Sequence, residues 1–319
     1  MFFVTARTVA KLLDFSRGLC YSLFINIEKY GGCNRRLKGR ILMELEKTTL
    51  HIGLEKPVRL LHVTDSHIGL VDERDNERKR ALAARLSTPE KAMYLEEHIA
   101  YAKAHCDLLV HTGDLMDFVS HANVEKARQI VADEDFFFIA GNHDYSQYVG
   151  EAWEDNAYRM NSYMQMGYGL GVPMFFNAKT VGGVNIVGID NSYYQFEDWQ
   201  LWRLQREVEK GLPILLAFHD PLFEESLFQY HLVRVPNDCT YLVGCDEEHL
   251  LCYNEFRAVQ QRPTETTLRF IDYIKHEPLI KAILTGHLHF SFESMLTDTL
   301  PQYVTGGGYE GIARELTII

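Results

Sequence analysis

Five short apolar runs in this chain each end in residues of the kinds that bind metal ions. The clearest run is 136–140, which leads directly into a Gly-Asn-His-Asp turn. A buried strand that stops at a glycine turn presents the side chains after it at one edge of a sheet. The five polar clusters are, in chain order, Asp65-x-His67, Gly113-Asp114, Gly141-Asn142-His143-Asp144, His219 and Gly286-His287-x-His289. One such cluster alone is more often a solvated loop, so the interpretation rests on their number and order.

Strand-like and helix-like segments alternate along the first half of the folded region. Besides the run at 136–140, the pattern predicts buried strands at 58–63 and 108–111 and helices at about 89–105 and 121–132. This alternation predicts βαβ units and a mainly parallel sheet. Because open α/β sheets bind ligands at the carboxyl ends of their strands, we expect the polar clusters to lie close together. Asp65 and His67, two residues apart in extended backbone, should point to the same side.

The second half of the chain continues the alternation, with one exception. Further strands are expected near 173–179, 183–190, 213–218 and 281–285, further helices within 150–168, 197–211 and 264–278, and closing strands within 302–319. Residues 221–262 show no clear period and many aromatic residues, so we interpret them as an insertion that shapes the substrate site. No second-domain linker is recognised, and the domain is expected to cover 40–319.

Residues 1–39 are interpreted as an N-terminal extension that contains an amphipathic helix. Their apolar residues recur close to helical spacing, while Lys11, Asp14 and Arg17 interrupt any continuous apolar run. These charges argue against a transmembrane span and against a signal peptide. The helix is expected to pack on the domain or on a partner, with peripheral membrane attachment as the alternative.

The composition restricts the partners and the compartment. A formal net charge of −12 disfavours long nucleic acid and anionic membrane surfaces, because the long-range field repels both. A small phosphorylated substrate stays compatible, since metal cations can reverse the potential locally. The six cysteines include no CxxC pair. Such spacing is typical of reduced thiols and predicts a cytoplasmic protein.

The order and content of the five clusters resemble the calcineurin-like metallophosphoesterase superfamily, whose members carry DxH, GD, GNH(D/E), H and GHxH in that sequence. The resemblance spans about residues 58–290. It implies a four-layer α/β/β/α sandwich of two mixed sheets flanked by helices. It also implies a dinuclear metal site at the strand ends between the two sheets.

The resemblance further implies a role for each residue of the clusters. Carboxylate, imidazole and amide-oxygen ligands suit Mn, Fe or Zn. His143 would lie over the phosphate as a catalytic group, with Asp144 orienting its ring. The implied ligands are Asp65, His67, Asp114 and His289 for one ion and Asp114, Asn142, His219 and His287 for the other, with Asp114 bridging the two.

Several residues outside these ligand sets also have expected roles. Asp117 stands at the last position of a GDxxD form of the second motif and is interpreted as support for the ligands. Asp220 either orients His219 or caps the next turn. His62 and His111, which lie within or near predicted strands, are expected to be packed core histidines.

The activity implied is hydrolysis of a phosphoester by a hydroxide that bridges two metal ions. The third motif ends in Asp144 and not in glutamate, which departs from serine/threonine protein phosphatases. The pattern is similar to that of cyclic-nucleotide and other small-molecule phosphodiesterases, and this is the predicted class. Two alternatives stay open: a phosphoesterase for phospholipid-linked substrates at a membrane surface, and a non-catalytic metal-bound binding or scaffold module.

Overall fold

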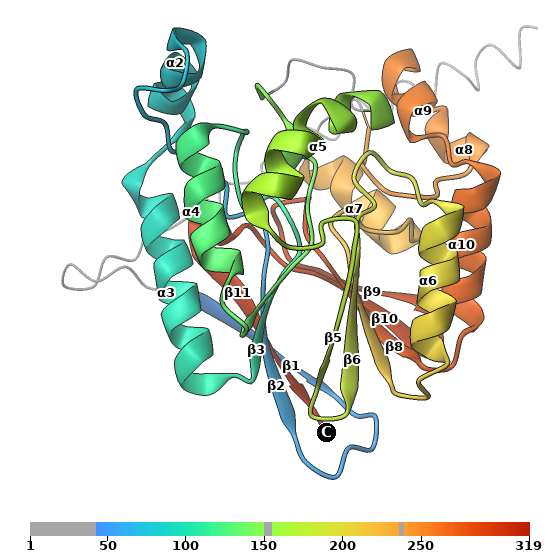
Figure 1. Ribbon diagram of the computed structural model, residues 1–319. Coiled ribbons are helices and arrows are strands. Elements are labelled where there is room, and N and C mark those ends of the chain that lie inside the picture. Colours follow the sequence, from blue (N-terminus) through green and yellow to red (C-terminus); the bar gives the residue numbers. More distant parts are fainter. Residues whose placement is uncertain (1–42, 150–154, 236–238) are drawn as a thin grey trace, which may run out of the picture. The chain divides into compact units, whose positions relative to one another are not determined.

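Two mixed β-sheets are built from the apolar runs of the sequence (Figure 1). The computed structural model of the protein describes residues 43–149, 155–235 and 239–319. These residues belong to one unit, 43–319. The amphipathic helix predicted within residues 1–39 lies outside the described residues. Within the described part, no helix is long and apolar enough to cross a membrane.

The first sheet contains the three parallel strands predicted from the alternation of strands and helices. Strands β2, β3 and β4 run parallel, β11 pairs antiparallel with β2, and β1 pairs parallel with β11. The predicted ends of the strands at 58–63 and 108–111 are confirmed. The order across this sheet is β1 (Glu44–Leu50), β11 (Ile312–Ile318), β2 (Val58–Val63), β3 (Leu108–His111) and β4 (Phe136–Phe138).

The second sheet combines a parallel centre with antiparallel edges. Its strands are, in order across the sheet, β5 (Phe176–Val181), β6 (Val184–Ile189), β7 (Ile214–Ala217), β8 (Ile280–Thr285), β10 (Leu300–Val304) and β9 (Phe292–Thr297). Strands β6, β7, β8 and β10 run parallel, whereas β5 and β9 pair antiparallel with their neighbours. The carboxyl ends of β7 and β8 therefore reach the same edge of this sheet.

Helices cover the outer faces of both sheets. Figure 1 shows α3 (Pro89–His105) and α4 (His121–Val131) beside the first sheet, and α6 (Asp198–Val208) and α10 (Glu265–His276) beside the second. The predicted bounds of α3 are confirmed, with Pro89 in its first turn. Helices α2 (Glu77–Leu86) and α5 (Asn156–Leu170) lie in the connections. The side chain of Asn76 caps α2 by accepting the N–H of Lys79.

Alternating side chains of the strands divide the core into three layers. Leu60 of β2 packs between the two sheets in one cluster with Leu215 of β7. The next residue, Leu61, points the other way and packs in one cluster with Ala127 of α4. On the far side, Leu216 of β7 shares a cluster with residues of α6 and α10. A period of two along each strand produces this separation, and the predicted four-layer α/β/β/α sandwich is confirmed.

The insertion at 221–262 is more regular than its sequence indicated. It forms α7 (Glu225–Arg234), α8 (Glu247–Leu250) and α9 (Glu255–Gln261). Its apolar side chains, among them Phe228, Leu242 and Leu250, pack into one cluster with Leu288, Phe290 and Val304. Helices this short complete too few turns to leave a clear period in the sequence, which is why the pattern did not predict them.

Candidate metal centre

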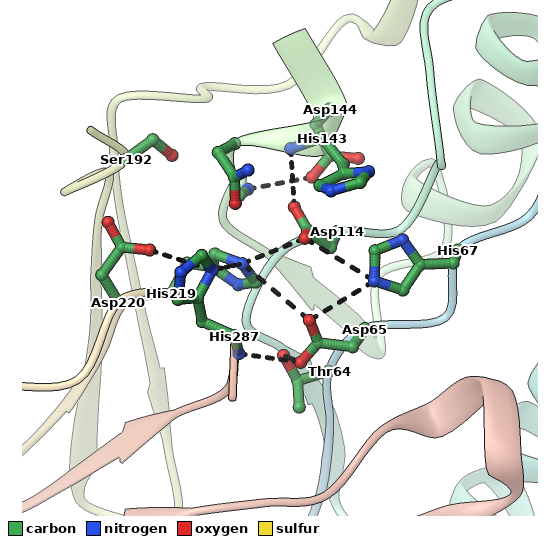
Figure 2. A network of polar contacts seen from close by, with 12 residues as sticks. Thr64, Asp65, His67, Asp114, His143, Asp144, Ser192, His219, Asp220 and His287 are labelled. Atoms are coloured by element: carbon green, nitrogen blue, oxygen red, sulfur yellow. Dashed lines mark hydrogen bonds and ion pairs between the residues drawn. The ribbon is translucent and has the colours of Figure 1, made fainter. Parts of the chain in front are cut away.

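The loops after β2, β3, β7 and β8 bring the predicted ligands together between the sheets (Figure 2). Backbone hydrogen bonds tie these loops to one another: the Asp65 N–H donates to the Gly113 carbonyl, and the Gly286 N–H donates to the His219 carbonyl, both at 3.0 Å. Among the described residues, three groups of side chains have ligand atoms close enough to share one ion. Two consist of predicted ligands: Asp65, His67 and His289, and Asp114, His219 and His287. The third is His67, Asp117 and His143.

Five of the predicted ligands adopt left-handed backbone conformations, which L-residues other than glycine rarely do. Extended backbone was expected for Asp65 and His67, and this expectation is wrong. Both side chains reach the site because sharp turns follow the end of β2. Strain of this kind persists where surrounding structure enforces it, and it is concentrated at functional sites. The φ angles are 52° for Asp65, 46° for His67, 53° for Asp114, 67° for His287 and 57° for His289.

Two glycines allow the turns to pack against each other. Gly113 has a φ of 96°, and a Cβ atom there would lie 2.5 Å from the backbone nitrogen of Gly141. A Cβ atom on Gly141 would lie 2.3 Å from Oδ1 of Asp114. Both separations are far below van der Waals contact, so the close approach of the two loops requires glycine at these positions.

The carboxylate of Asp65 has one oxygen fixed by the protein and the other directed at imidazoles. Oδ2 accepts hydrogen bonds from the Thr64 hydroxyl at 2.8 Å and from the His287 backbone N–H at 2.9 Å. Oδ1 lies 3.2 Å from Nε2 of His289 and 3.6 Å from Nε2 of His67. The fixed oxygen orients the carboxylate, and the second oxygen is placed among nitrogen ligands.

Asp114 repeats this arrangement between the two groups of ligands. Its Oδ1 accepts the backbone N–H of His143 at 2.8 Å. Its Oδ2 lies 3.2 Å from Nε2 of His219 and 3.7 Å from Nε2 of His67. One oxygen atom thus faces a predicted ligand of each ion, His219 and His67.

The histidines are held with one ring nitrogen toward the centre. His219 is fully buried, and its Nδ1 lies 2.7 Å from the carbonyl oxygen of Thr112. A carbonyl only accepts hydrogen bonds, so Nδ1 carries the proton and Nε2 is left to bind a cation. Nδ1 of His287 lies 3.2 Å from this Nε2 atom, and together these two nitrogens face Oδ2 of Asp114.

The electrostatics of the first group also fit a cation. Nε2 of His67 lies 3.1 Å from Nε2 of His289. Burial alone would lower the pKa of His67, but the carboxylates of Asp117 and Asp65 outweigh burial and raise it to about 10. The position therefore attracts positive charge strongly. Clusters of imidazole nitrogen and carboxylate oxygen suit Mn, Fe or Zn ions, and these residues fit a dinuclear site.

Asn142 was predicted as a further ligand of the second ion. The structure buries its side chain and places it in the wall of a cleft that Asp114, His287 and His289 also line. The cleft has a volume of about 330 Å³. His289 lies at its mouth, where its side chain is 40% exposed. The site can therefore be reached from solvent, although most of its predicted ligands are buried.

His143 is oriented by Asp117, and the expected contact with Asp144 is not the one observed. Nδ1 of His143 lies 3.0 Å from the backbone oxygen of Asp117 and 3.2 Å from its Oδ1 atom. The Asp144 carboxylate instead accepts the backbone N–H groups of Gly141 and Met116, both at 2.9 Å. Asp144 thus fixes the turn that carries His143, while Asp117 contacts the ring itself.

Asp220, which was expected either to orient His219 or to cap the next turn, contacts His287 and the backbone of Tyr194. Its Oδ1 lies 3.4 Å from Nδ1 of His287, and its Oδ2 accepts the backbone N–H of Tyr194. The predicted core histidines are confirmed. His62 is buried between the hydroxyls of Thr112 and Thr305, and His111 is buried against Ser66.

Several residues of the cleft wall were not predicted from the sequence. Tyr194 follows β6, and three others belong to the insertion: His231, Tyr241 and Arg257. No motif marks these side chains, because the insertion carries none of the five polar clusters. Their approach to the metal centre depends on how the insertion folds.

The chain belongs to the calcineurin-like phosphoesterase family, whose model matches residues 58–291. It is thus a metallophosphoesterase-family hydrolase with a set of His and Asp residues that fits two metal ions. A search of curated proteins found no match to this chain.

Solved structures similar to this chain come from distant proteins. A dimetal phosphatase from Danio rerio is 13% identical, with a TM-score of 0.45 and coverage of 79% of this chain and 88% of that one. The calcineurin-like phosphoesterase YfkN from Bacillus subtilis is 14% identical, with a TM-score of 0.43 and coverage of 79% and 82%. A phosphopantetheinyl hydrolase from Mycobacterium tuberculosis is 16% identical, with a TM-score of 0.37 and coverage of 79% and 90%. Identities this low carry no information about the substrate.

Proposed function

We propose that the protein is a metal-dependent phosphodiesterase that acts on a small phosphorylated molecule. The observation that supports this proposal most directly is the position of Asp114. One of its carboxylate oxygens faces His219 at 3.2 Å and His67 at 3.7 Å, and the other is fixed by the backbone of His143. The same side chain thus links both candidate metal sites to the candidate catalytic histidine.

The ligands divide between the two ions as their positions allow. Asp65, His67 and His289 would hold one ion, Asn142, His219 and His287 would hold the other, and Asp114 would bridge them. When bound, the two ions supply Lewis acidity to the phosphoryl oxygens and lower the pKa of the attacking water. The protein's part is to fix the ligands, through the hydrogen bonds of Thr64, Thr112 and Asp117.

His143 is the candidate proton donor to the leaving oxygen. Its Nδ1 faces the Asp117 carbonyl oxygen, which only accepts hydrogen bonds, so the proton on Nδ1 is committed there. Burial disfavours a charged ring, but the carboxylates of Asp114 and Asp117 outweigh it and raise the pKa of His143. The raised pKa favours a second proton on Nε2, and that proton is the one available for transfer.

The size of the cleft favours a small substrate. Its volume of about 330 Å³ lies at the lower end of the range for small-molecule sites, roughly 300–1,000 Å³. A long duplex would also meet a chain with a net charge of −12. A small phosphorylated substrate, the exclusion of long nucleic acid and a cytoplasmic location stay predictions.

The proposal is tested by hydrolysis of bis-p-nitrophenyl phosphate and p-nitrophenyl phosphate by protein stripped of metal and then supplied with Mn, Fe or Zn. Restored turnover of the diester, in excess over the monoester, is the expected result. The His143→Ala variant should lose at least about 100-fold in kcat while its metal content stays the same. His276→Ala, on the exposed face of α10, is the matched control and should keep full activity.

A metal-bound binding or scaffold module is the competing account. It predicts two bound ions, no turnover of either ester, and no difference between wild type and His143→Ala. If His143→Ala loses metal in proportion to its loss of activity, His143 belongs to the metal centre and is not the proton donor.

A further inference from the structure

The insertion builds one wall of the metal cleft. His231 lies on α7, Tyr241 lies between α7 and α8, and Arg257 lies on α9. All three line the same cleft as Asp114 and His287. We refer to His231, Tyr241 and Arg257 as the insertion wall.

Tyr241 connects the insertion wall to the metal centre. Its ring centroid lies 5.5 Å from that of His287, and the guanidinium carbon of Arg257 lies 5.3 Å from the same tyrosine centroid. Arg257 and His287 therefore both lie close to the ring of Tyr241. A hydrogen bond of 2.6 Å from Nη1 of Arg257 to Oε1 of Gln260 helps to hold the guanidinium in this place.

Arg257 gives the insertion wall a permanent positive charge. Among the described residues that line the cleft, it is the only lysine or arginine. A guanidinium offers several N–H donors in a planar fork that matches phosphate oxygens. The ions of the metal centre attract the phosphate that reacts, whereas Arg257 is displaced from them and can attract a different anionic group.

His231 provides a second, independent observation. Its side chain is only 2% exposed, and within the described residues its Nδ1 atom is buried without a hydrogen-bond partner. Burial lowers the pKa of His231 to about 4, so the ring is neutral and one of its nitrogens carries a proton at neutral pH. A ligand in the cleft that bonds to this atom would remove the unfavourable free energy of leaving it unpaired.

We infer that the insertion wall binds a second phosphate group of the substrate, so that the substrate class is phosphoesters that carry another phosphate beside the one that reacts. This inference rests on the proposed function for the identity of the reacting group. The guanidinium of Arg257 and the buried ring of His231 both offer N–H groups to this second phosphate, and the planar guanidinium fork matches phosphate oxygens. On this inference the insertion selects substrates that carry a second phosphate, and the metal centre supplies the chemistry.

Binding of two nucleotides to the Mn-loaded protein tests the inference without requiring turnover. Thymidine 3′,5′-bisphosphate and thymidine 5′-phosphate differ by one phosphate, and calorimetry at matched free Mn gives both affinities. The wild type should bind the bisphosphate at least about tenfold more tightly. Equal affinities for the two nucleotides would overturn the inference.

Variants assign the effect to the insertion wall. Arg257→Gln should reduce the tenfold preference to about twofold or less and leave the affinity for thymidine 5′-phosphate unchanged. Arg257→Lys keeps the charge and should retain part of the preference, and His231→Phe should weaken only bisphosphate binding. Arg206→Gln, on the exposed surface of α6, is the control and should behave as wild type. Equal weakening of both nucleotides by Arg257→Gln would show a structural role and contradict the inference.

Turnover separates this inference from the proposed function. The 5′-p-nitrophenyl esters of the same two nucleotides are the substrates. If neither ester is hydrolysed while the preference for the bisphosphate depends on Arg257, the proposed function fails and the insertion wall stands. If both are hydrolysed with equal kcat/KM in wild type and Arg257→Gln, the proposed function stands and the insertion wall fails.

Discussion

Asp117 contacts the candidate catalytic residue His143 directly: its Oδ1 atom lies 3.2 Å from Nδ1 of the imidazole. The same oxygen lies 3.1 Å from Nδ1 of His67, and the other carboxylate oxygen lies 3.1 Å from Nζ of Lys91. One side chain therefore orients both a metal ligand and the candidate proton donor. An outer carboxylate of this kind fixes the tautomer and direction of the rings that it contacts.

Asp117→Asn should lower both metal affinity and turnover. The amide keeps the size of the side chain but removes the negative charge shared by the two rings. A loss of about 10–100-fold in Mn affinity or in kcat for bis-p-nitrophenyl phosphate is expected. Titration with Mn followed by assay at saturating Mn separates the two effects. Asp133→Asn, which removes an ion pair with Lys103 away from the site, is the control.

An opposite result would restore the role that the sequence suggested for Asp144. If Asp117→Asn keeps wild-type kcat while Asp144→Asn changes the pH profile of kcat, then Asp144 controls the protonation of His143. The structure instead predicts that Asp144→Asn acts on the turn, because its carboxylate accepts the N–H groups of Gly141 and Met116.

Asp114→Asn should reduce the occupancy of both metal ions. Its Oδ2 atom faces His219 and His67, so the loss of charge there removes attraction for both cations. Metal analysis after dialysis against limiting Mn should show a loss in each of the two equivalents. Asp198→Asn, an exposed residue at the start of α6, should leave the metal content unchanged. Two full equivalents in the Asp114 variant would contradict the bridging position.

Gly141→Ala should disable the site through a steric effect. The new Cβ atom would lie 2.3 Å from Oδ1 of Asp114 and 2.6 Å from its backbone nitrogen. The two loops must separate to relieve this overlap, so metal content and activity should fall together. Gly183→Ala is the control, since its φ is 88° and a Cβ atom there meets nothing within 4 Å. That variant should lose about 1 kcal/mol of unfolding free energy and keep its metal. Full metal content in Gly141→Ala would show that the loops tolerate the methyl group.

The buried His98 predicts a loss of stability in mild acid. Burial lowers its pKa from 6.5 to about 4. Between these values the unfolded chain binds a proton that the folded protein does not, so the unfolding free energy falls as the pH falls. For this one side chain the change from pH 7 to pH 5 is about 2 kcal/mol. Urea titrations at pH 7 and at pH 5 measure this change in unfolding free energy. Between the two pH values, the His98→Leu variant should lose about 2 kcal/mol less than wild type. The same loss in both proteins would contradict the assignment of the effect to His98.

The sequence predicted the strands better than the loops between them. The strands ending at Val63 and His111 are almost entirely buried, and their predicted ends are correct. The left-handed turns at Asp65 and His67 could not be read in the same way. A positive φ is uncommon in residues other than glycine, and its enrichment at Asp and His is too small to predict it at one position. Tertiary contacts between neighbouring loops impose that conformation.

In the candidate site too, the positions set by strand ends could be predicted from the sequence, and the contacts set by loops could not. The residues that meet at the metal centre follow the ends of strands, and parallel topology alone brings such ends to one edge. The partner of His143 is different, because Asp144 is adjacent to it in the sequence whereas Asp117 lies 26 residues earlier, and only the fold selects between them. Arg257 reaches the cleft from an insertion with no motif, so nothing in the sequence alone connected it to the ligands.

The most direct test of the whole account is the metal stoichiometry of the full chain measured beside its turnover of bis-p-nitrophenyl phosphate. Metal-stripped protein is titrated with Mn, and bound metal and rate are followed in the same samples. The account predicts that turnover is absent without metal, rises with metal content and reaches its maximum at two ions per chain. Full turnover at one ion per chain, or turnover that persists in stripped protein, would contradict a dinuclear site built around Asp114.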